Sequence, residues 1–230
     1  EKFRTARLHY YAQVLWIDEQ VGQVLDFLEA RGEREQTIIV FGADHGNPIG
    51  DTGAFEKHTF TPTVHRVPLL ISWPGTLPAG EVRAEVCDSL DLGPTLLGLA
   101  GLAIPEGFRG RQLFHDPAPG VSYSTIGFGQ KDSRMGPNGG RGEWYGGRGW
   151  PRRSCIRTQQ FRLDKNMLLD CAKPAPEDED IFLADTLADP QEFTNLAHDP
   201  AYADTVRQLG GLLDRHAEGA IEIAHEYLRR

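Results

Sequence analysis

Two adjacent side chains with metal-binding chemistry follow an apolar run early in the sequence. Asp44 and His45 stand two and three residues after Gly42, at the end of the run Thr37–Phe41. A carboxylate oxygen and an imidazole nitrogen can bind one divalent cation if the backbone turns so that both face it. Gly42 and Gly46 flank the pair and make such a turn easier. Taken alone, the pair leaves a structural or capping role open beside a metal-binding role.

A lysine returns 12 residues after His45, at the end of a loop rich in glycine and proline. This loop, residues 47–56, can fold back over the end of the preceding strand and present Lys57. A surface lysine is ordinarily only solvated. An ammonium group beside a bound cation, however, would neutralise an oxyanion and the charge that builds on its oxygens during group transfer. Asp44, His45 and Lys57 together therefore predict a site that transfers an anionic group.

The two apolar runs around this loop predict the strands that position the site. Thr37–Phe41 is β-branched and too short for a helix, and Val67–Trp73 is stopped by Pro74 and Gly75. Continuous apolar runs of this length are typical of strands buried on both faces. In open parallel sheets, sites collect beyond the carboxyl ends of the strands, which is where Asp44 and His45 stand.

Two helices are predicted around these strands. Apolar residues at spacings of three and four in residues 8–31 indicate an amphipathic helix that ends at Gly32. Asp91, with Pro94 in the first turn, begins a second helix that ends near Gly101. Residues 1–117 are therefore expected to form an α/β domain, part of a mostly parallel sheet flanked by helices.

Residues 118–230 are expected to form a small α+β C-terminal subdomain. Short strand-like segments at residues 121–128 and 154–170 predict a short antiparallel sheet, and Asp199 followed by Pro200 predicts the start of a terminal helix. The glycine- and arginine-rich stretch at 134–153 fits either a surface loop or a loop that contacts substrate.

The overall composition narrows the class of ligand. The formal net charge of -9 argues against a general nucleic-acid binder, so an anionic substrate needs a local cation cluster or a metal ion. No apolar window is long enough to predict a transmembrane helix.

The three cysteines lack metal-ligand spacing, which leaves structural thiols or one disulfide. The sequence begins at Glu1 without a signal sequence, so we expect a fragment or processed chain and leave the compartment open.

The stretch Thr37–Gly75 resembles the C-terminal half of the sulfatase family, within the alkaline phosphatase superfamily. In that family a strand ends in Asp-His/Asn-Gly, a lysine follows at a similar spacing, and an Arg-Val-Pro-Leu strand closes with Trp-Pro-Gly. Here the Arg66–Leu69 segment begins 9 residues after Lys57. Residues 88–113 and 155–202 also contain segments that follow the family in order, so the resemblance covers nearly the whole chain.

The resemblance implies a role for each candidate residue. Asp44 and His45 would be metal ligands, usually for Ca²⁺ and in some relatives for Mg²⁺ or Mn²⁺. Lys57 would bind the sulfate oxygens of the substrate and assist the leaving group as a catalytic residue. His58 stands beside it, and both a catalytic, substrate-facing role and ordinary loop hydrogen bonds are open for it.

The family nucleophile is absent from this sequence. It is a formylglycine made from a cysteine in a Cys-x-Pro/Ala-x-Arg context, and none of the three cysteines has that context. We therefore expect the formylglycine, and a pair of aspartate ligands, upstream of Glu1. The chain alone should be inactive and bind calcium weakly, because two ligands cannot satisfy a cation that takes six to eight oxygens. Thr61-Pro62 replaces an aromatic-acidic pair found in many relatives, which leaves the substrate class open.

The resemblance implies hydrolysis of a sulfate ester on a small molecule or carbohydrate. A hydrated formylglycine oxygen attacks the sulfur, the alcohol leaves, and the geminal hydroxyl then expels sulfate. Two alternatives stay open: a phosphodiesterase or phosphonate monoester hydrolase of the same superfamily, and a non-catalytic sulfatase-like module. Half of a large sheet would expose strand edges and apolar helix faces, so we expect an N-terminal half or a second chain to complete the fold.

Overall fold

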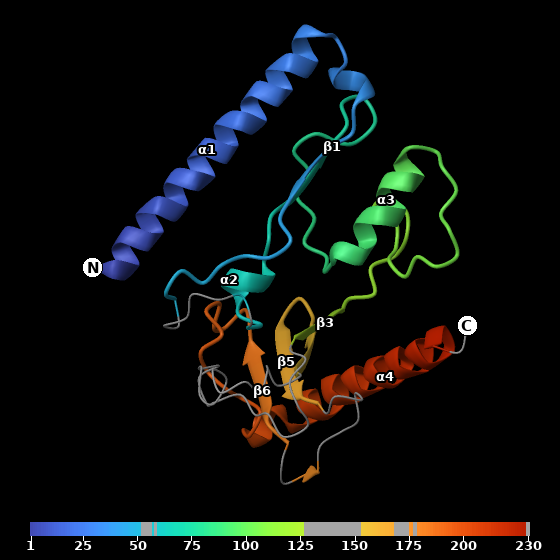
Figure 1. Ribbon diagram of the computed structural model, residues 1–230. Helices are drawn as coiled ribbons and strands as arrows, with labels where there is room; N and C mark the ends of the chain where they lie inside the picture. Colours follow the sequence, from blue (N-terminus) through green and yellow to red (C-terminus); the bar gives the residue numbers. More distant parts are fainter. Residues whose placement is uncertain (52–56, 58, 127–152, 168–174, 177–178, 229–230) are drawn as a thin grey trace. The chain divides into compact units, whose positions relative to one another are not determined.

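The structure is a computed structural model that describes residues 1–51, 57, 59–126, 153–167, 175–176 and 179–228, with side chains to residue 219 (Figure 1). His58 and residues 134–152 of the glycine- and arginine-rich stretch lie outside this part of the chain. The described residues group into two units, Glu1–Lys57 with Thr63–Arg83 and His58–Pro62 with Ala84–Arg230. The division between the units falls near residue 83, upstream of the domain boundary predicted at 117.

The described part of the first unit contains a long helix and a two-stranded sheet (Figure 1). Its elements are α1 (Lys2–Ala30), the 3₁₀ helix η1 (Arg34–Gln36), β1 (Ile39–Gly42) and β2 (Leu69–Ser72). The short helix α2 (Pro62–His65) begins where the chain re-enters this unit. Helix α1 ends as predicted, because Gly32 adopts a left-handed φ of 64° and its N–H donates to the carbonyl of Glu29 at 2.9 Å.

The prediction of a mostly parallel sheet is wrong for the strands that the structure describes. Strands β1 and β2 pair antiparallel, with Ile39 opposite Ser72 and Gly42 opposite Leu69. A parallel pair needs a crossover of a dozen or more residues, and the connection between Gly42 and Leu69 is long enough for either strand direction. Apolar runs identify strands, but they do not define strand direction.

The two strands are also not buried on both faces as predicted. The Leu70 side chain is 59% exposed, and Val40 and Phe41 are each more than a third exposed. Helix α1 contains no buried residue. The apolar faces of these elements are therefore not covered within the described part of the chain.

The described part of the second unit contains a short helix, a four-stranded sheet and a long terminal helix (Figure 1). Its elements are η2 (Ser89–Asp91), α3 (Leu92–Leu99), β3 (Ser122–Ile126), β4 (Arg153–Arg157), β5 (Phe161–Asn166), β6 (Ile181–Asp185), η5 (Pro200–Tyr202) and α4 (Ala203–Leu228). The strands pair in the order β3-β4-β5-β6, and every pair is antiparallel. The Asp199 side chain caps η5 by accepting from the N–H of Ala201 at 2.9 Å, just before α4 begins.

The core of the second unit lies between this sheet and α4. The fully or nearly fully buried side chains that pack together there are Ile156, Leu163, Leu183, Leu209 and Leu213. Leu209 and Leu213 stand four residues apart on α4, so both project from the same face of the helix toward the strands. In the part of the chain that the structure describes, no helix has the length and apolarity needed to cross a membrane.

Candidate functional site

The backbone beside the Asp-His pair is held by α2. Gly46 follows β1 and donates its N–H to the carbonyl of Val64 at 2.8 Å. A Cβ atom at position 46 would lie 1.9 Å from the carbonyl oxygen of Thr63, so only glycine allows this approach. The contact of Gly46 with α2 therefore defines the path of the chain after β1.

The loop that follows is held by α1. Arg7 donates from Nε to the carbonyl of Ile49 at 3.2 Å and forms an ion pair with the carboxylate of Asp51. The N–H of Ile49 donates to the side chain of Asn47, and the N–H of Asp51 donates to the carbonyl of Pro48. This turn is tight, since Ile49 has a positive φ of 42°. The first turns of α1 thus define the start of the loop that leads to Lys57.

The structure brings Asp44, His45 and Lys57 together around one imidazole nitrogen. His45 Nε2 lies 2.5 Å from Lys57 Nζ and 3.3 Å from Asp44 Oδ2. On the other side of the ring, Nδ1 lies 2.9 Å from the carbonyl oxygen of Gly46. A carbonyl only accepts hydrogen bonds, so Nδ1 carries the hydrogen and Nε2 carries the lone pair. An ammonium only donates, and Lys57 therefore donates to Nε2.

The carboxylate of Asp44 is exposed and ionised. Its side chain is 84% exposed, whereas that of His45 is 34% exposed. The backbone N–H of His45 donates to Asp44 Oδ1 at 2.8 Å and is the main cause that holds the pKa of Asp44 below its usual value. The positive charge of Lys57 lowers this pKa further. The site thus offers an anionic oxygen to solvent at neutral pH.

These donors fit part of the coordination shell of a divalent cation. A ligating histidine in proteins usually donates its other ring N–H to a carbonyl or carboxylate, and His45 has this arrangement with Gly46. Asp44 adds a hard oxygen close to the same nitrogen. Among the residues that the structure describes, no group of three or more Asp, Glu, His or Cys side chains could hold a metal ion. Within the described residues, Asp44 and His45 could therefore supply only part of the ligands that a divalent cation needs.

Sequence reasoning singled out three side chains that the structure brings close together, but it missed the residues that hold their backbone. Arg7 and the backbone of Val64 contact the site region from α1 and α2. The only sequence signal for these contacts was the glycine at position 46. His58, the other candidate catalytic residue, lies outside the described residues.

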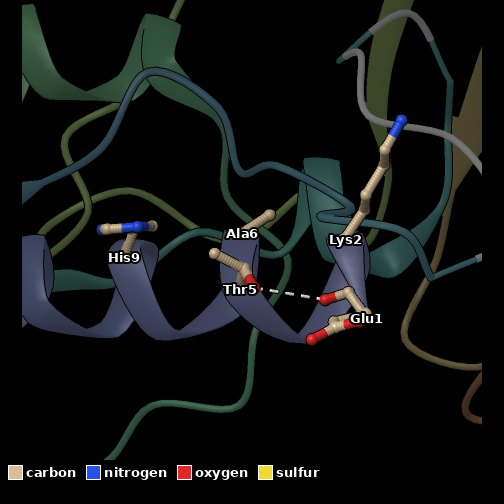
Figure 2. Close-up of a pocket in the computed structure, with 5 residues that line it drawn as sticks. All are labelled: Glu1, Lys2, Thr5, Ala6 and His9. Atoms are coloured by element: carbon tan, nitrogen blue, oxygen red, sulfur yellow. Dashed lines mark hydrogen bonds between the residues drawn. The ribbon is translucent and has the colours of Figure 1, made fainter.

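A shallow pocket lies elsewhere, on the first turns of α1 (Figure 2). It is lined by Glu1, Lys2, Thr5, Ala6 and His9. The Thr5 hydroxyl donates to the carbonyl of Glu1 at 3.3 Å along the helix. None of the residues that surround His45 Nε2 lines it, so this pocket is separate from the candidate site.

Comparison with known proteins gives consistent matches. The profile of the Sulfatase family matches residues 3–102. An N-acetylglucosamine-6-O-sulfatase of Bacteroides thetaiotaomicron is 30% identical over 213 residues, which cover 93% of this chain and 36% of that protein.

Two solved structures extend the match to the fold. A protein solved in complex with its substrate D-glucosamine-2-N,6-O-disulfate superposes with a TM-score of 0.73 at 26% identity, covering 91% of this chain and 40% of that one. A phosphonate monoester hydrolase from Silicibacter pomeroyi superposes with a TM-score of 0.69 at 28% identity, covering 87% and 38%. The chain thus spans well under half the length of these relatives. It belongs to the sulfatase family, within the alkaline phosphatase superfamily, and matches part of the length of the family's members.

Proposed function

We propose that this chain contributes one side of the active site of a sulfate ester hydrolase. In this proposal Asp44 and His45 hold a divalent cation and Lys57 binds the sulfate group. The observation that carries it is the convergence of a carboxylate and an ammonium on one imidazole nitrogen, with Nζ at 2.5 Å and Oδ2 at 3.3 Å from Nε2. The sulfatases among the relatives support the choice of sulfate esters as the substrate class.

The metal ligands would be the Asp44 carboxylate and the Nε2 lone pair of His45. A bound cation, most simply Ca²⁺ and alternatively Mg²⁺ or Mn²⁺, would supply positive charge next to the oxygens of the transferring group. The carbonyl of Gly46 accepts from Nδ1 of His45, so the lone pair is on Nε2, where a cation would bind in place of the Lys57 ammonium. Two protein donors leave most of the positions of a calcium shell to other groups.

Lys57 would contribute charge to the transfer itself. Its ammonium would bind a non-bridging sulfate oxygen and would stabilise the charge that develops on the departing alkoxide. The same ammonium is a source of the proton that the leaving alcohol needs. His58 follows Lys57 directly in the chain, and we propose it as the second group that faces the substrate.

The nucleophile in this proposal is a formylglycine supplied by residues outside this sequence. The sequence contexts of Cys87, Cys155 and Cys171 do not match the motif that is converted to formylglycine. In the structure Cys155 is buried, and burial raises the pKa of its thiol to about 12, so it is not a nucleophile at neutral pH. The missing aspartate ligands and the cover of the exposed apolar faces would come from an N-terminal half or a second chain.

A sulfated carbohydrate is the proposed substrate class. The sequence match is to an N-acetylglucosamine-6-O-sulfatase, and a structural match was solved with a disulfated glucosamine. The alternative is a phosphonate monoester or phosphodiester, which the similarity to a phosphonate monoester hydrolase supports.

The test is an assay of the complete protein with p-nitrophenyl sulfate and with bis-p-nitrophenyl phosphate. We expect hydrolysis of the sulfate ester to dominate, to be lost on removal of metal by EGTA, and to return with Ca²⁺. Asp44→Asn should lower metal affinity about 10- to 100-fold or more, because it removes an anionic ligand. Asp26→Asn, on the exposed surface of α1, is the matched control and should leave affinity unchanged. Equal metal affinity in the two variants would refute the assignment, and a preference for the phosphodiester would favour the alternative.

A further inference from the structure

The ammonium of Lys57 lies next to the nitrogen that the proposed cation needs. Its Nζ is 2.5 Å from Nε2 of His45, and Asp44 Oδ2 is 3.3 Å from the same nitrogen. An imidazole nitrogen and a carboxylate oxygen are also the neighbours of many divalent cations in proteins. The positive group with these neighbours in the structure is therefore a side chain of the protein itself.

The lone pair of Nε2 can have one partner at a time. Nδ1 of His45 donates to the carbonyl of Gly46, so the ring has no second lone pair for a cation. An ammonium and a divalent cation side by side at one nitrogen would also repel each other. Cation binding at Nε2 therefore requires the ammonium of Lys57 to leave, and Lys57 competes with the cation for this nitrogen.

The imidazole is held in place, whereas the ammonium ends a long side chain. The carbonyl of Gly46 holds the His45 ring, and the N–H of Gly46 donates to the carbonyl of Val64 on α2 at 2.8 Å. Lys57 is exposed, and its ammonium lies at the end of a flexible stem of carbon atoms. An exchange of the ammonium for a cation can therefore leave the backbone beside His45 unchanged.

The displaced ammonium needs a new partner with negative charge. In the proposed function this partner is a sulfate oxygen next to the cation. An anion that binds Lys57 would offset the hydrogen bond lost at Nε2 and would thereby favour cation binding. Coupling of this kind is reciprocal, so the cation must favour anion binding by the same factor.

We propose that Lys57 couples cation binding to anion binding by exchanging between Nε2 of His45 and the sulfate group. Without a cation, its ammonium occupies the lone pair of Nε2. With a cation, the ammonium is available to the anion, so the two ligands bind cooperatively. The proposal rests on the proposed function of Asp44, His45 and Lys57, and the contact that carries it lies within the first unit.

The experiment measures Ca²⁺ binding to the complete protein by isothermal titration calorimetry and compares Lys57→Met with Lys2→Met. Lys57→Met removes the ammonium and keeps an unbranched side chain. Lys2 lies on α1 in the same unit and is also exposed, so Lys2→Met controls for the loss of one positive charge. Because both positions are exposed, both variants should fold, which circular dichroism checks.

The first readout is the affinity for Ca²⁺ without sulfate. Lys57→Met should bind Ca²⁺ about tenfold more tightly than the parent, because binding no longer requires the ammonium to leave. Lys2→Met should stay within about twofold of the parent, because salt screens the effect of an exposed charge. Affinity in Lys57→Met that equals that in Lys2→Met, or lies below it, would overturn the proposal.

The second readout is the effect of sulfate on the affinity for free Ca²⁺, with sodium chloride keeping the ionic strength constant. In the parent and in Lys2→Met, sodium sulfate should raise this affinity about fivefold. In Lys57→Met the increase should be less than about twofold, because the residue that links the two ligands is gone. The same increase in all three proteins would show that the coupling does not pass through Lys57.

The third readout separates the exchange from the proposed function. Mass spectrometry measures the acetylation of Lys57 by an N-hydroxysuccinimide ester relative to that of Lys2 in the same sample. Ca²⁺ should raise this relative rate several-fold, because the amine leaves Nε2. If Ca²⁺ raises the rate but neither p-nitrophenyl sulfate nor bis-p-nitrophenyl phosphate is hydrolysed, the proposed function fails and the exchange stands. If the sulfate ester is hydrolysed with Ca²⁺ but the rate at Lys57 does not change, the exchange is refuted and the proposed function stands.

Discussion

At the scale of single residues, His45 organises the site because its two nitrogens have different partners. Nδ1 donates to Gly46 and Nε2 accepts from Lys57. One lone pair cannot serve a cation and an ammonium at once, so a cation bound at Nε2 would take the place of Lys57 there. Lys57 would then be released toward the bound anion, which is where the proposed function needs it.

Gly46→Ala tests how far the backbone beside His45 defines the site. The new Cβ would overlap the carbonyl oxygen of Thr63 at 1.9 Å, so the chain must shift away from α2. We expect weaker metal binding, by about tenfold, measured by isothermal titration calorimetry of the complete protein. Gly107→Ala, at a glycine with nothing within 4 Å of the added atom, should bind metal like the parent. Unchanged affinity for Gly46→Ala would contradict the role of α2.

Asp185 provides a test of pH dependence away from the site. Its pKa is lowered chiefly by the N–H of Ala188 and also by the side chain of Gln160 and the N–H of Leu187. A lowered folded-state pKa means that the carboxylate contributes stability above its unfolded pKa of about 4, and that this contribution is lost as the pH falls toward the folded value. The free energy of unfolding of Asp185→Asn should therefore lie below that of the parent near pH 7, and the difference should shrink below about pH 4. Urea denaturation at several pH values measures this, and a constant difference would argue against it.

At the scale of elements, the C-terminal sheet and α4 stabilise each other through one apolar face. Leu213 of α4 is fully buried among Ile156, Leu163 and Leu183. The pattern of strands fits this arrangement, since β3 to β6 follow one another in both sequence and sheet order. Antiparallel pairing between strands that follow one another in the chain requires no crossover.

Leu213→Ala tests the contribution of this face to stability. The substitution leaves a cavity in a packed core, so we expect the free energy of unfolding to fall by about 2–5 kcal/mol. Leu187→Ala removes the same atoms at a position that is 70% exposed, and it should change stability by less than about 0.5 kcal/mol. Chemical denaturation followed by circular dichroism distinguishes the two. Similar losses in both variants would show that α4 does not dock as described.

At the scale of the whole molecule, the described chain exposes large apolar side chains along α1. Leu15 and Trp16 are 70% and 63% exposed. Large exposed apolar surfaces are typical of interaction sites or of surfaces prone to aggregation. This exposure is the physical basis for the proposed N-terminal half or second chain.

A consequence is that the 230-residue chain produced alone should self-associate. We expect size-exclusion chromatography to show species larger than a monomer, with binding of the dye ANS to exposed apolar surface. Replacing Leu15 and Trp16 by lysine should reduce both signals. Replacing Leu187 and Phe193, which are exposed to a similar degree in the second unit, should reduce them less. A compact monomer that binds no dye would contradict the need for a covering partner.

Most elements could be predicted from local pattern. The end of α1 followed from Gly32 and the start of the terminal helix from Asp199 and Pro200, because caps act within one turn. Strand direction could not be predicted, since an apolar run such as Val67–Trp73 has the same composition in either direction. The prediction that β1 and β2 are buried on both faces failed for a related reason. Burial depends on which other elements pack against a strand, and the sequence of the strand does not contain that information.

The sequence by itself determined which chemical groups this protein has and in what order: a carboxylate and an imidazole at the end of a strand, with an ammonium 12 residues later. Only the tertiary structure decided that Lys57 meets His45 at Nε2 and that Phe60 is held by Arg157 and Arg162. The physical reason is the sequence separation over which each kind of interaction acts. Caps and apolar periodicity act between near neighbours, whereas these contacts join residues as far as 102 positions apart, and only the folded chain brings them within hydrogen-bonding distance.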